Sequence, residues 1–241
     1  CRCANTGAGC QPVTWALVPA AGSGRRFGGE VPKQYLRAAG KPLIEHALDA
    51  LLAHPGVDGV VVALAAEDTR WPGWTSLYGK PVVTCIGGGE RADSVLAALH
   101  GLLAGTAEAE LLLVHDAARP NLHADDITAL IAAANTCADG AILAAPVRDT
   151  LKRADAATRI ATTEPRDGLG RARTPQAFRR DLLRRALERA QADGLIATCE
   201  AMAVERLGLR PALVEGREDN LKVTTPADLA LAEFLLGRAS R

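Results

Sequence analysis

Residues 14–29 of this 241-residue chain read TWALVPAAGSGRRFGG and join a short apolar run to a loop rich in glycine and arginine. The run at 14–18 has the character of a buried strand. Glycines let a backbone approach an anion closely, and successive N–H groups can then turn inward around it. Arg25, Arg26 and, shortly after the loop, Lys33 add positive charge. This combination indicates a site for a triphosphate.

The loop does not match the standard nucleotide-binding motifs. A Walker sequence ends in Gly-Lys followed by Ser or Thr, whereas Gly28 is followed by Gly29 and Glu30. A dinucleotide fingerprint that starts at Gly22 needs its third glycine at position 27, which is Phe27. A plain glycine-rich surface turn is the remaining alternative, but a turn has no need of arginine. The cations therefore favour an anion-binding loop.

Outside this loop, short apolar runs alternate with segments of helical spacing. Strand character is found at residues 14–18, 59–65, 81–86, 111–115 and 141–147, and helical spacing at 43–53, 91–103, 125–135 and 179–193. The alternation predicts an α/β fold, a Rossmann-like and mostly parallel twisted sheet with helices on both faces. Sheets of this kind bind ligands beyond the carboxyl ends of their strands.

Composition bounds the class of protein. The hydrophobic content of 48% suffices for a sizeable core, and we expect residues 13–241 to form a single domain after a disordered leader at 1–12. The 28 basic residues balance 28 acidic ones, so we expect neither nucleic acid nor a membrane as partner. The leader's Cys1, Cys3 and Cys10 lack the CxxC pair of a metal site. These features predict a cytoplasmic protein.

Residues 148–174 interrupt the pattern. They are polar, rich in Arg, Thr and Asp, and show no helical or strand period long enough to make core. A segment of this length is unusual as a connection inside a compact domain. It is predicted to be functional or to form an arm that packs on a partner chain, and a flexible surface loop is the alternative.

An acid follows the apolar run at 111–114. Asp116 lies at the carboxyl end of a predicted central strand, where Mg²⁺ or another divalent cation can bridge it to a triphosphate. Arg119 can face an acid or a phosphate as a fork. As an alternative, Asp116 caps the following turn. His115 is interpreted as structural, since no second ligand lies at metal spacing.

Two further stretches carry candidate ligand-binding groups. Gly88 and Ser94 belong to a glycine run that follows a strand and opens a helix, where N–H donors can meet anions or base edges. Taken alone, this run reads as a turn with Ser94 on the helix surface. Late in the chain, Lys222 can close on a substrate phosphate or can simply be solvated.

Taken together, the stretches resemble one enzyme family, the 2-C-methyl-D-erythritol 4-phosphate cytidylyltransferases, over about residues 13–238. The signatures are PAAGSGRR at 19–26, PKQY at 32–35, ERADSV at 90–95, VHDAARP at 114–120, APVRDT at 145–150, TPQ at 174–176 and VEGREDNLKVT at 214–224. Gly89, Gly170 and Cys199 depart from the family pattern, since an acid, a bulky residue and an Asp are common at these places.

The resemblance implies cytidylyl transfer from CTP to 2-C-methyl-D-erythritol 4-phosphate (MEP), with release of pyrophosphate, in isoprenoid precursor biosynthesis. It implies a glycosyltransferase-A-like nucleotidyltransferase fold, a Mg²⁺ cofactor, and a homodimer in which the arm carries Arg166 into the neighbouring site. The family's catalytic residues match Arg26 and Lys33. Its nucleotide-binding residues match Pro19, Ala20, Ala21, Gly22, Gly24, Gly88, Ser94, Asp116 (also the metal ligand) and Ala117, and its acceptor-binding residues match Arg119, Thr150, Arg166, Thr174 and Lys222.

Two other functions remain open at this point. A ribitol 5-phosphate cytidylyltransferase would share the nucleotide site and differ in its acceptor. A catalytically silent nucleotide-binding module of the same fold would bind CTP without releasing pyrophosphate.

Overall fold

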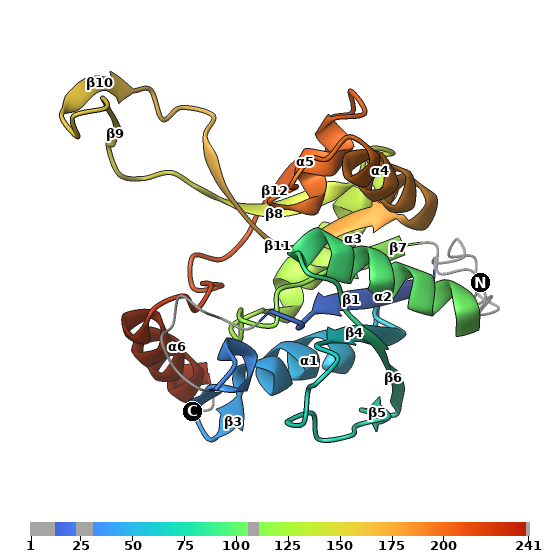
Figure 1. Ribbon diagram of the computed structural model, residues 1–241. Helices are drawn as coiled ribbons and strands as arrows, with labels where there is room; N and C mark the ends of the chain where they lie inside the picture. Colours follow the sequence, from blue (N-terminus) through green and yellow to red (C-terminus); the bar gives the residue numbers. More distant parts are fainter. Residues whose placement is uncertain (1–12, 23–30, 106–110, 240–241) are drawn as a thin grey trace.

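An eight-stranded sheet forms the centre of the molecule, within the residues that the computed structural model describes, 13–22, 31–105 and 111–239 (Figure 1). The strand order across the sheet is β12-β8-β11-β7-β1-β4-β6-β5. The strands are β1 (Thr14–Pro19), β4 (Gly59–Leu64), β5 (Ser76–Leu77), β6 (Lys80–Ile86), β7 (Leu111–Val114), β8 (Ala141–Pro146), β11 (Gly170–Arg179) and β12 (Ala212–Glu215).

Most neighbouring strands of the sheet run parallel. Strand β1 lies between β4 and β7 and is parallel to both, β4 is parallel to β6, and β8 is parallel to β12. Antiparallel pairing occurs where β11 lies between β7 and β8, and at the edge between β5 and β6. This arrangement confirms the predicted Rossmann-like, mostly parallel sheet.

Helices cover both faces of the sheet (Figure 1). They are α1 (Leu43–Ala53), α2 (Arg91–Gly105), α3 (Ala124–Thr136), α4 (Arg180–Ala192) and α5 (Glu200–Glu205), whereas α6 (Pro226–Ala239) lies beside the sheet. Trp15 and Leu17 of β1 share one core with α2, α4 and α5, whereas Ala16 and Val18 share the other with α1 and α3. Alternate side chains of a strand point to opposite faces, and here both faces are buried.

Residues 148–174 form strands, and among them only Arg173 and Thr174 are buried, so the segment contributes little to the core, as expected. Strands β9 (Leu151–Ala154) and β10 (Ile160–Glu164) form an antiparallel hairpin, and β11 also begins within this segment. The sequence pattern does not indicate β11, because Pro175 lies within it and a proline argues against a central strand. The structure accommodates it with a register shift against β8 between Ala172 and Gln176.

The β9–β10 hairpin projects away from the sheet as an arm (Figure 1). Residues 152–163 of this hairpin are all exposed. This shape matches the predicted arm, while its packing on a partner chain stays a prediction. The predicted leader at residues 1–12 lies outside the described residues.

A small third core lies beside the main sheet and fixes two segments that reach the candidate site. It joins α6 and α1 to a ribbon of β2 (Arg37–Ala38) and β3 (Lys41–Pro42), which follows a short 3₁₀ helix at Lys33–Tyr35. Val223, next to Lys222, is fully buried in it, together with Ala38 and Leu43. The chain on either side of these anchors is therefore held in place.

Replacing Phe178 tests the central position of β11. Its side chain is fully buried and packs in the core under α4. Phe178→Ala should lower the free energy of unfolding by about 3–5 kcal/mol, because it removes a large buried ring and leaves a cavity. Phe234→Ala, at a 60% exposed ring of α6, should cost less than about 1 kcal/mol. Urea unfolding measures both, and equal losses would contradict the assignment.

Candidate active site

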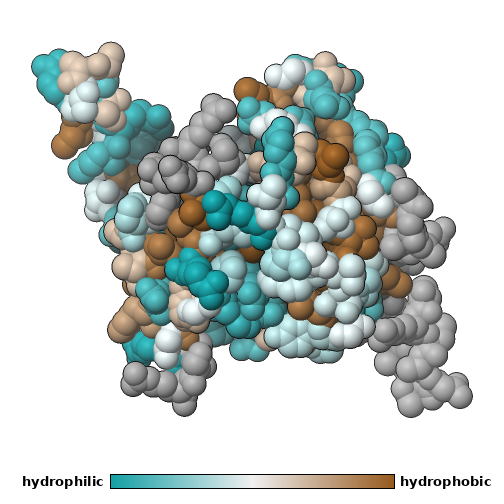
Figure 2. Space-filling model, turned by 60° about the horizontal axis from the view of Figure 1, so that its bottom comes forward, coloured by the Kyte–Doolittle hydropathy of each residue, from teal (hydrophilic) through white to brown (hydrophobic). Residues whose placement is uncertain are grey.

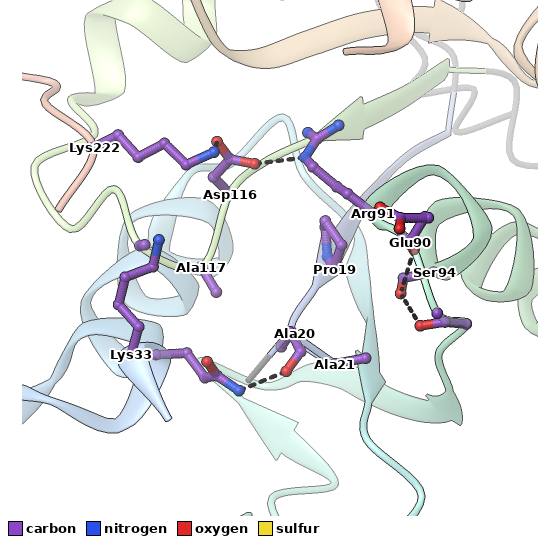
Figure 3. A pocket seen from close by; sticks show the side chains of 15 residues that line it. Pro19, Ala20, Ala21, Lys33, Glu90, Arg91, Ser94, Asp116, Ala117 and Lys222 are labelled. Atoms are coloured by element: carbon purple, nitrogen blue, oxygen red, sulfur yellow. Dashed lines mark hydrogen bonds and ion pairs between the residues drawn. The ribbon is translucent and has the colours of Figure 1, made fainter. Parts of the chain in front are cut away.

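A cavity opens beyond the carboxyl ends of β1, β6 and β7 (Figure 3). Its lining comes from five separate segments of the chain: the loop after β1, the 3₁₀ helix, the turn into α2, the loop that carries Asp116 and the segment that carries Lys222. The lining residues are Pro19, Ala20, Ala21, Gly22, Lys33, Gln34, Gly88, Gly89, Glu90, Arg91, Ser94, Asp116, Ala117, Ala118 and Lys222. Its place matches the rule for ligand sites in open α/β sheets.

The loop after β1 is held to the sheet and to the 3₁₀ helix at its start. The Ala20 N–H donates to the Ala63 carbonyl at 2.8 Å, and the Gln34 side-chain amide donates to the Ala20 carbonyl at 2.6 Å. Gln34 is buried, so its hydrogen bond holds the start of this loop in place. Gly24 and Arg26, both predicted site residues, lie outside the described residues.

The glycine turn after β6 packs closely on the first turn of α2. The Ser94 hydroxyl lies 3.3 Å from the Gly88 carbonyl and 3.2 Å from the Glu90 carbonyl (Figure 3). Ser94 is 3% exposed, so the alternative of a solvent-facing helix residue is wrong. The Asp93 carboxylate accepts the Glu90 N–H at 3.1 Å and thereby closes the turn.

Asp116 is the charge centre of the cavity (Figure 3). Its Oδ1 accepts a hydrogen bond from Arg91 Nε at 2.8 Å. Its Oδ2 lies 2.9 Å from Lys222 Nζ and 3.5 Å from Arg119 Nε. The carboxylate thus bonds to cationic side chains from three segments, an arrangement that the simple turn-capping alternative does not explain.

Burial and charge act in opposite directions on Asp116. Burial alone would raise the pKa of its carboxyl group, but the charges of Arg91, Lys222 and Arg119 outweigh burial and hold the pKa well below its usual value. The carboxylate is therefore ionised throughout the neutral range. A permanent anion surrounded by cations can exchange one of them for a metal ion or release one to a phosphate.

Thr174 and His115 form a buried hydrogen-bonded group that holds the backbone of Asp116. The Thr174 hydroxyl accepts the Asp116 N–H at 3.0 Å and lies 3.1 Å from His115 Nδ1, while His115 Nε2 lies 3.1 Å from the Arg119 carbonyl. Burial lowers the pKa of His115 to about 4, so the ring is neutral at pH 7. These contacts agree with the interpretation of His115 as structural. Contact of Thr174 with an acceptor stays a prediction.

The segment that precedes Lys222 is fixed by buried polar contacts. Arg119 donates to the Asn220 carbonyl at 2.8 Å, and the Asn220 amide donates to the Thr174 carbonyl at 2.8 Å. Asn220 is fully buried. Lys222 itself is 38% exposed, which leaves its long side chain able to move between Asp116 and an incoming ligand.

Predicted acceptor-binding residues in and near the arm do not line this cavity. Thr150 precedes β9, and Arg166 follows β10, where its guanidinium donates to the Arg148 carbonyl. Both residues are exposed. The structure therefore does not bring them together with Asp116 within one chain.

Sequence reasoning missed two charged residues that contact each other. Arg91 belongs to the motif at 90–95, but no role was predicted for it, and it binds Asp116 directly. Glu200, the first residue of α5, is 1% exposed and pairs with Arg91. The one sequence signal near Glu200 is the departure of Cys199 from the family pattern, because α5 has only six residues, too few to show a helical period.

A divalent cation fits the donor set when a nucleotide supplies further ligands. The described residues contain no group of three or more His, Cys, Asp or Glu side chains that could hold a metal ion. Mg²⁺ usually takes one or two protein carboxylates and completes its shell with phosphates and water. Asp116, an ionised and buried carboxylate that lines the cavity, suits that role.

No helix among the described residues is long and apolar enough to span a membrane.

A sequence profile of the family IspD, 2-C-methyl-D-erythritol 4-phosphate cytidylyltransferase, matches residues 14–238. The enzyme of that name from Xanthomonas campestris pv. campestris (strain 8004) is 60% identical over 227 residues, which cover 94% of this chain and 86% of the relative. The enzyme of the same name from Stenotrophomonas maltophilia (strain K279a) is 58% identical over 224 residues, which cover 93% of this chain and 97% of the relative.

Solved structures show the same similarity. A crystal structure of 4-diphosphocytidyl-2C-methyl-D-erythritol synthase matches with a TM-score of 0.79 and 39% identity, over 93% of this chain and 99% of that one. The Francisella tularensis 2-C-methyl-D-erythritol 4-phosphate cytidylyltransferase matches with a TM-score of 0.78 and 30% identity, over 92% and 99%. This chain belongs to the 2-C-methyl-D-erythritol 4-phosphate cytidylyltransferase family.

Proposed function

We propose that the protein transfers a cytidylyl group from CTP to MEP, giving 4-diphosphocytidyl-2-C-methyl-D-erythritol and pyrophosphate, in isoprenoid precursor biosynthesis. One observation carries the proposal beyond family membership. Asp116 lies between Arg91 and Lys222 in a cavity walled by the glycine-containing loops after β1 and β6. Backbone donors and cations on opposite sides of one cavity suit a nucleoside triphosphate and a second phosphate.

The reaction needs alignment and charge neutralisation more than proton transfer. A phosphate oxygen of MEP attacks the α-phosphorus of CTP, a new P–O bond forms, and the bond to the β-phosphate oxygen breaks. The electron pair leaves with pyrophosphate. Because the attacking phosphate monoester is already anionic at neutral pH, no general base is required. Catalysis is then electrostatic and positional.

Cations of this chain would carry that catalysis. Lys33 and Lys222 both line the cavity and lie on the same side of it (Figure 3). We assign Lys33, together with Arg26, to the triphosphate, and Lys222 to the phosphate of the acceptor. Lys222 would leave Asp116 when that phosphate arrives, and Oδ2 would then keep only Arg119, at 3.5 Å, as its cationic neighbour.

Asp116 would be the residue that holds Mg²⁺. When bound, the ion would act as a Lewis acid and stabilise negative charge on the triphosphate. The donor set of one carboxylate with nucleotide phosphates agrees with the preference of Mg²⁺.

We further propose a homodimer in which the arm brings Thr150 and Arg166 to the acceptor site of a second subunit. The exposed hairpin, together with the position of both residues outside the cavity of their own chain, supports this proposal. All substrates are water-soluble phosphates, which supports a cytoplasmic location.

The glycine turn after β6 offers a test of the nucleotide wall. A Cβ added at Gly88 would lie 2.3 Å from Asp93 Cβ and 3.2 Å from the Asp93 carbonyl carbon. Gly88→Ala should therefore displace the turn and raise the KM for CTP by about tenfold, the scale of 1.4 kcal/mol in binding. A Cβ at Gly89 has no heavy atom within 4 Å among the described residues, so Gly89→Ala should have a much smaller effect. Equal KM values for both variants would contradict this account of the turn.

Product identification tests the proposal as a whole. The purified protein is incubated with CTP, MEP and Mg²⁺, and the products are separated and analysed by mass spectrometry and ³¹P NMR. Formation of a cytidine diphosphate ester together with pyrophosphate is expected. CTP that binds but stays intact would instead favour the nucleotide-binding module.

A further inference from the structure

We propose that Glu200 is a positioning residue for cytidylyl transfer, because it holds Arg91 in the one orientation that fixes Asp116 in the cavity. This inference rests on the proposed function and adds to it a residue from α5, outside the cavity lining.

Glu200 is a buried carboxylate whose two oxygens both bind Arg91. Its side chain is 1% exposed, Oε2 accepts from Arg91 Nη2 at 3.1 Å, and Oε1 accepts from Arg91 Nη1. A buried charge requires a partner, and a two-pronged guanidinium–carboxylate pair fixes direction as well as distance. Glu200 and Arg91 therefore act as one structural unit.

Arg91 carries that fixed direction into the cavity. Its guanidinium is planar and rigid, so holding both Nη atoms also sets the direction of the Nε–H bond. That bond donates to Asp116 Oδ1 at 2.8 Å, and Figure 3 shows Arg91 reaching Asp116 from the start of α2. The side chain of Arg91 is 23% exposed, compared with 38% for Lys222.

The two oxygens of Asp116 consequently have different surroundings. Oδ1 is bound by Arg91, which is fixed by Glu200, whereas Oδ2 is bound by Lys222 on its long and more exposed side chain, with Arg119 farther away at 3.5 Å. Oδ1 is thus the permanent anchor of the carboxylate, and Oδ2 is the oxygen that becomes available when Lys222 moves to a ligand. Glu200 determines this division through Arg91.

The position of α5 supports a role in the site. The Ala201 N–H, next to Glu200, donates to Gln176 Oε1 at 2.9 Å, and Gln176 is 1% exposed. Gln176 belongs to β11, the strand that also contains Thr174, whose hydroxyl accepts the Asp116 N–H. The side chain and the backbone of Asp116 are therefore both held by groups anchored on β11 or on α5. Stability alone does not require such an ion pair, since apolar residues of similar volume often replace buried pairs without loss.

A double-mutant cycle tests the proposal in the full-length protein. Glu200→Gln keeps the shape of the side chain and removes its charge, and Arg91→Gln removes the group through which it acts. Each variant should lower kcat by about 10- to 100-fold, the scale of a misplacement near 1 Å, with a smaller change in the KM for CTP. The double variant should be no slower than Arg91→Gln alone. Losses in kcat that multiply, or a wild-type rate for Glu200→Gln, would overturn the proposal.

Two controls separate positioning from general damage. Glu205→Gln alters an exposed acid at the other end of α5 and should keep the wild-type kcat. If Glu200→Gln does not fold, Arg91→Lys replaces it, since a single ammonium cannot bind both Glu200 oxygens and Asp116 together. A wild-type kcat for Arg91→Lys would then overturn the proposal. Wild-type protein that neither binds CTP in calorimetry nor releases pyrophosphate would refute the proposed function itself.

Discussion

Lys33→Ala is expected to lower turnover with CTP and MEP by about two orders of magnitude or more, on the scale of one preorganised donor at a developing charge. Lys33 belongs to the 3₁₀ helix that lines the cavity, next to Gln34, which ties this helix to the loop after β1. Its ammonium group would neutralise the triphosphate as pyrophosphate leaves. Initial rates at saturating CTP and MEP measure the effect on kcat.

Lys41→Ala is the matched control for this variant. Lys41 lies 3.3 Å from Glu45 and 2.6 Å from Asp49, in an ion pair that is remote from the cavity lining. Its removal should leave kcat within about twofold, because Lys41 does not line the cavity. The loss of its exposed ion pairs should cost at most about 1 kcal/mol of stability. Near-normal turnover of Lys33→Ala would refute the assignment of Lys33.

Asp116→Asn is expected to lower turnover by about 100- to 1,000-fold, again on the scale of a preorganised electrostatic group. The amide keeps the shape of the side chain, but it removes the charge that holds Arg91, Lys222 and Arg119 together. If this carboxylate also binds Mg²⁺, the metal concentration for half-maximal rate should rise. Initial rates across a Mg²⁺ titration measure both effects.

Folding must be followed in the same experiment, since removing one partner of a buried ion pair can cost about 3–5 kcal/mol. Asp126→Asn provides the comparison. Asp126 on α3 is 6% exposed and accepts the Arg217 N–H at 3.3 Å, outside the cavity lining. It should be destabilised without losing turnover per folded molecule. A folded Asp116→Asn protein with the wild-type rate and Mg²⁺ dependence would contradict the role of Asp116.

The sequence was sufficient to predict most of the parallel part of the fold, although β12, which is parallel to β8, was missed. Strands β1 and β7 were placed within one residue at each end, because strands buried on both faces are apolar throughout. Helix α1 was placed at its observed bounds by its apolar spacing. Strand β11 was missed because its position depends on pairing with β7 and β8 and not on local pattern, and because Pro175 interrupts it.

In the candidate site, too, residues close to strand ends could be predicted, whereas residues brought in by tertiary packing could not. Ala21, Gly88 and Asp116 closely follow strands, and Ser94 lies in the first turn of the helix after β6, so the topology alone places them at one edge of the sheet. Glu200 could not be found in this way. It lies 109 residues from Arg91 in the sequence, and only the packing of α5 brings the two charges together.

Acceptor choice is the most direct test of the central claim. Pyrophosphate release is measured with CTP and Mg²⁺ in parallel reactions that contain MEP, ribitol 5-phosphate or no acceptor. We predict turnover with MEP and none above background in the other two reactions. Turnover with ribitol 5-phosphate alone would keep the nucleotide site and overturn the acceptor, and silence in all three reactions would contradict the assignment of this protein as a cytidylyltransferase.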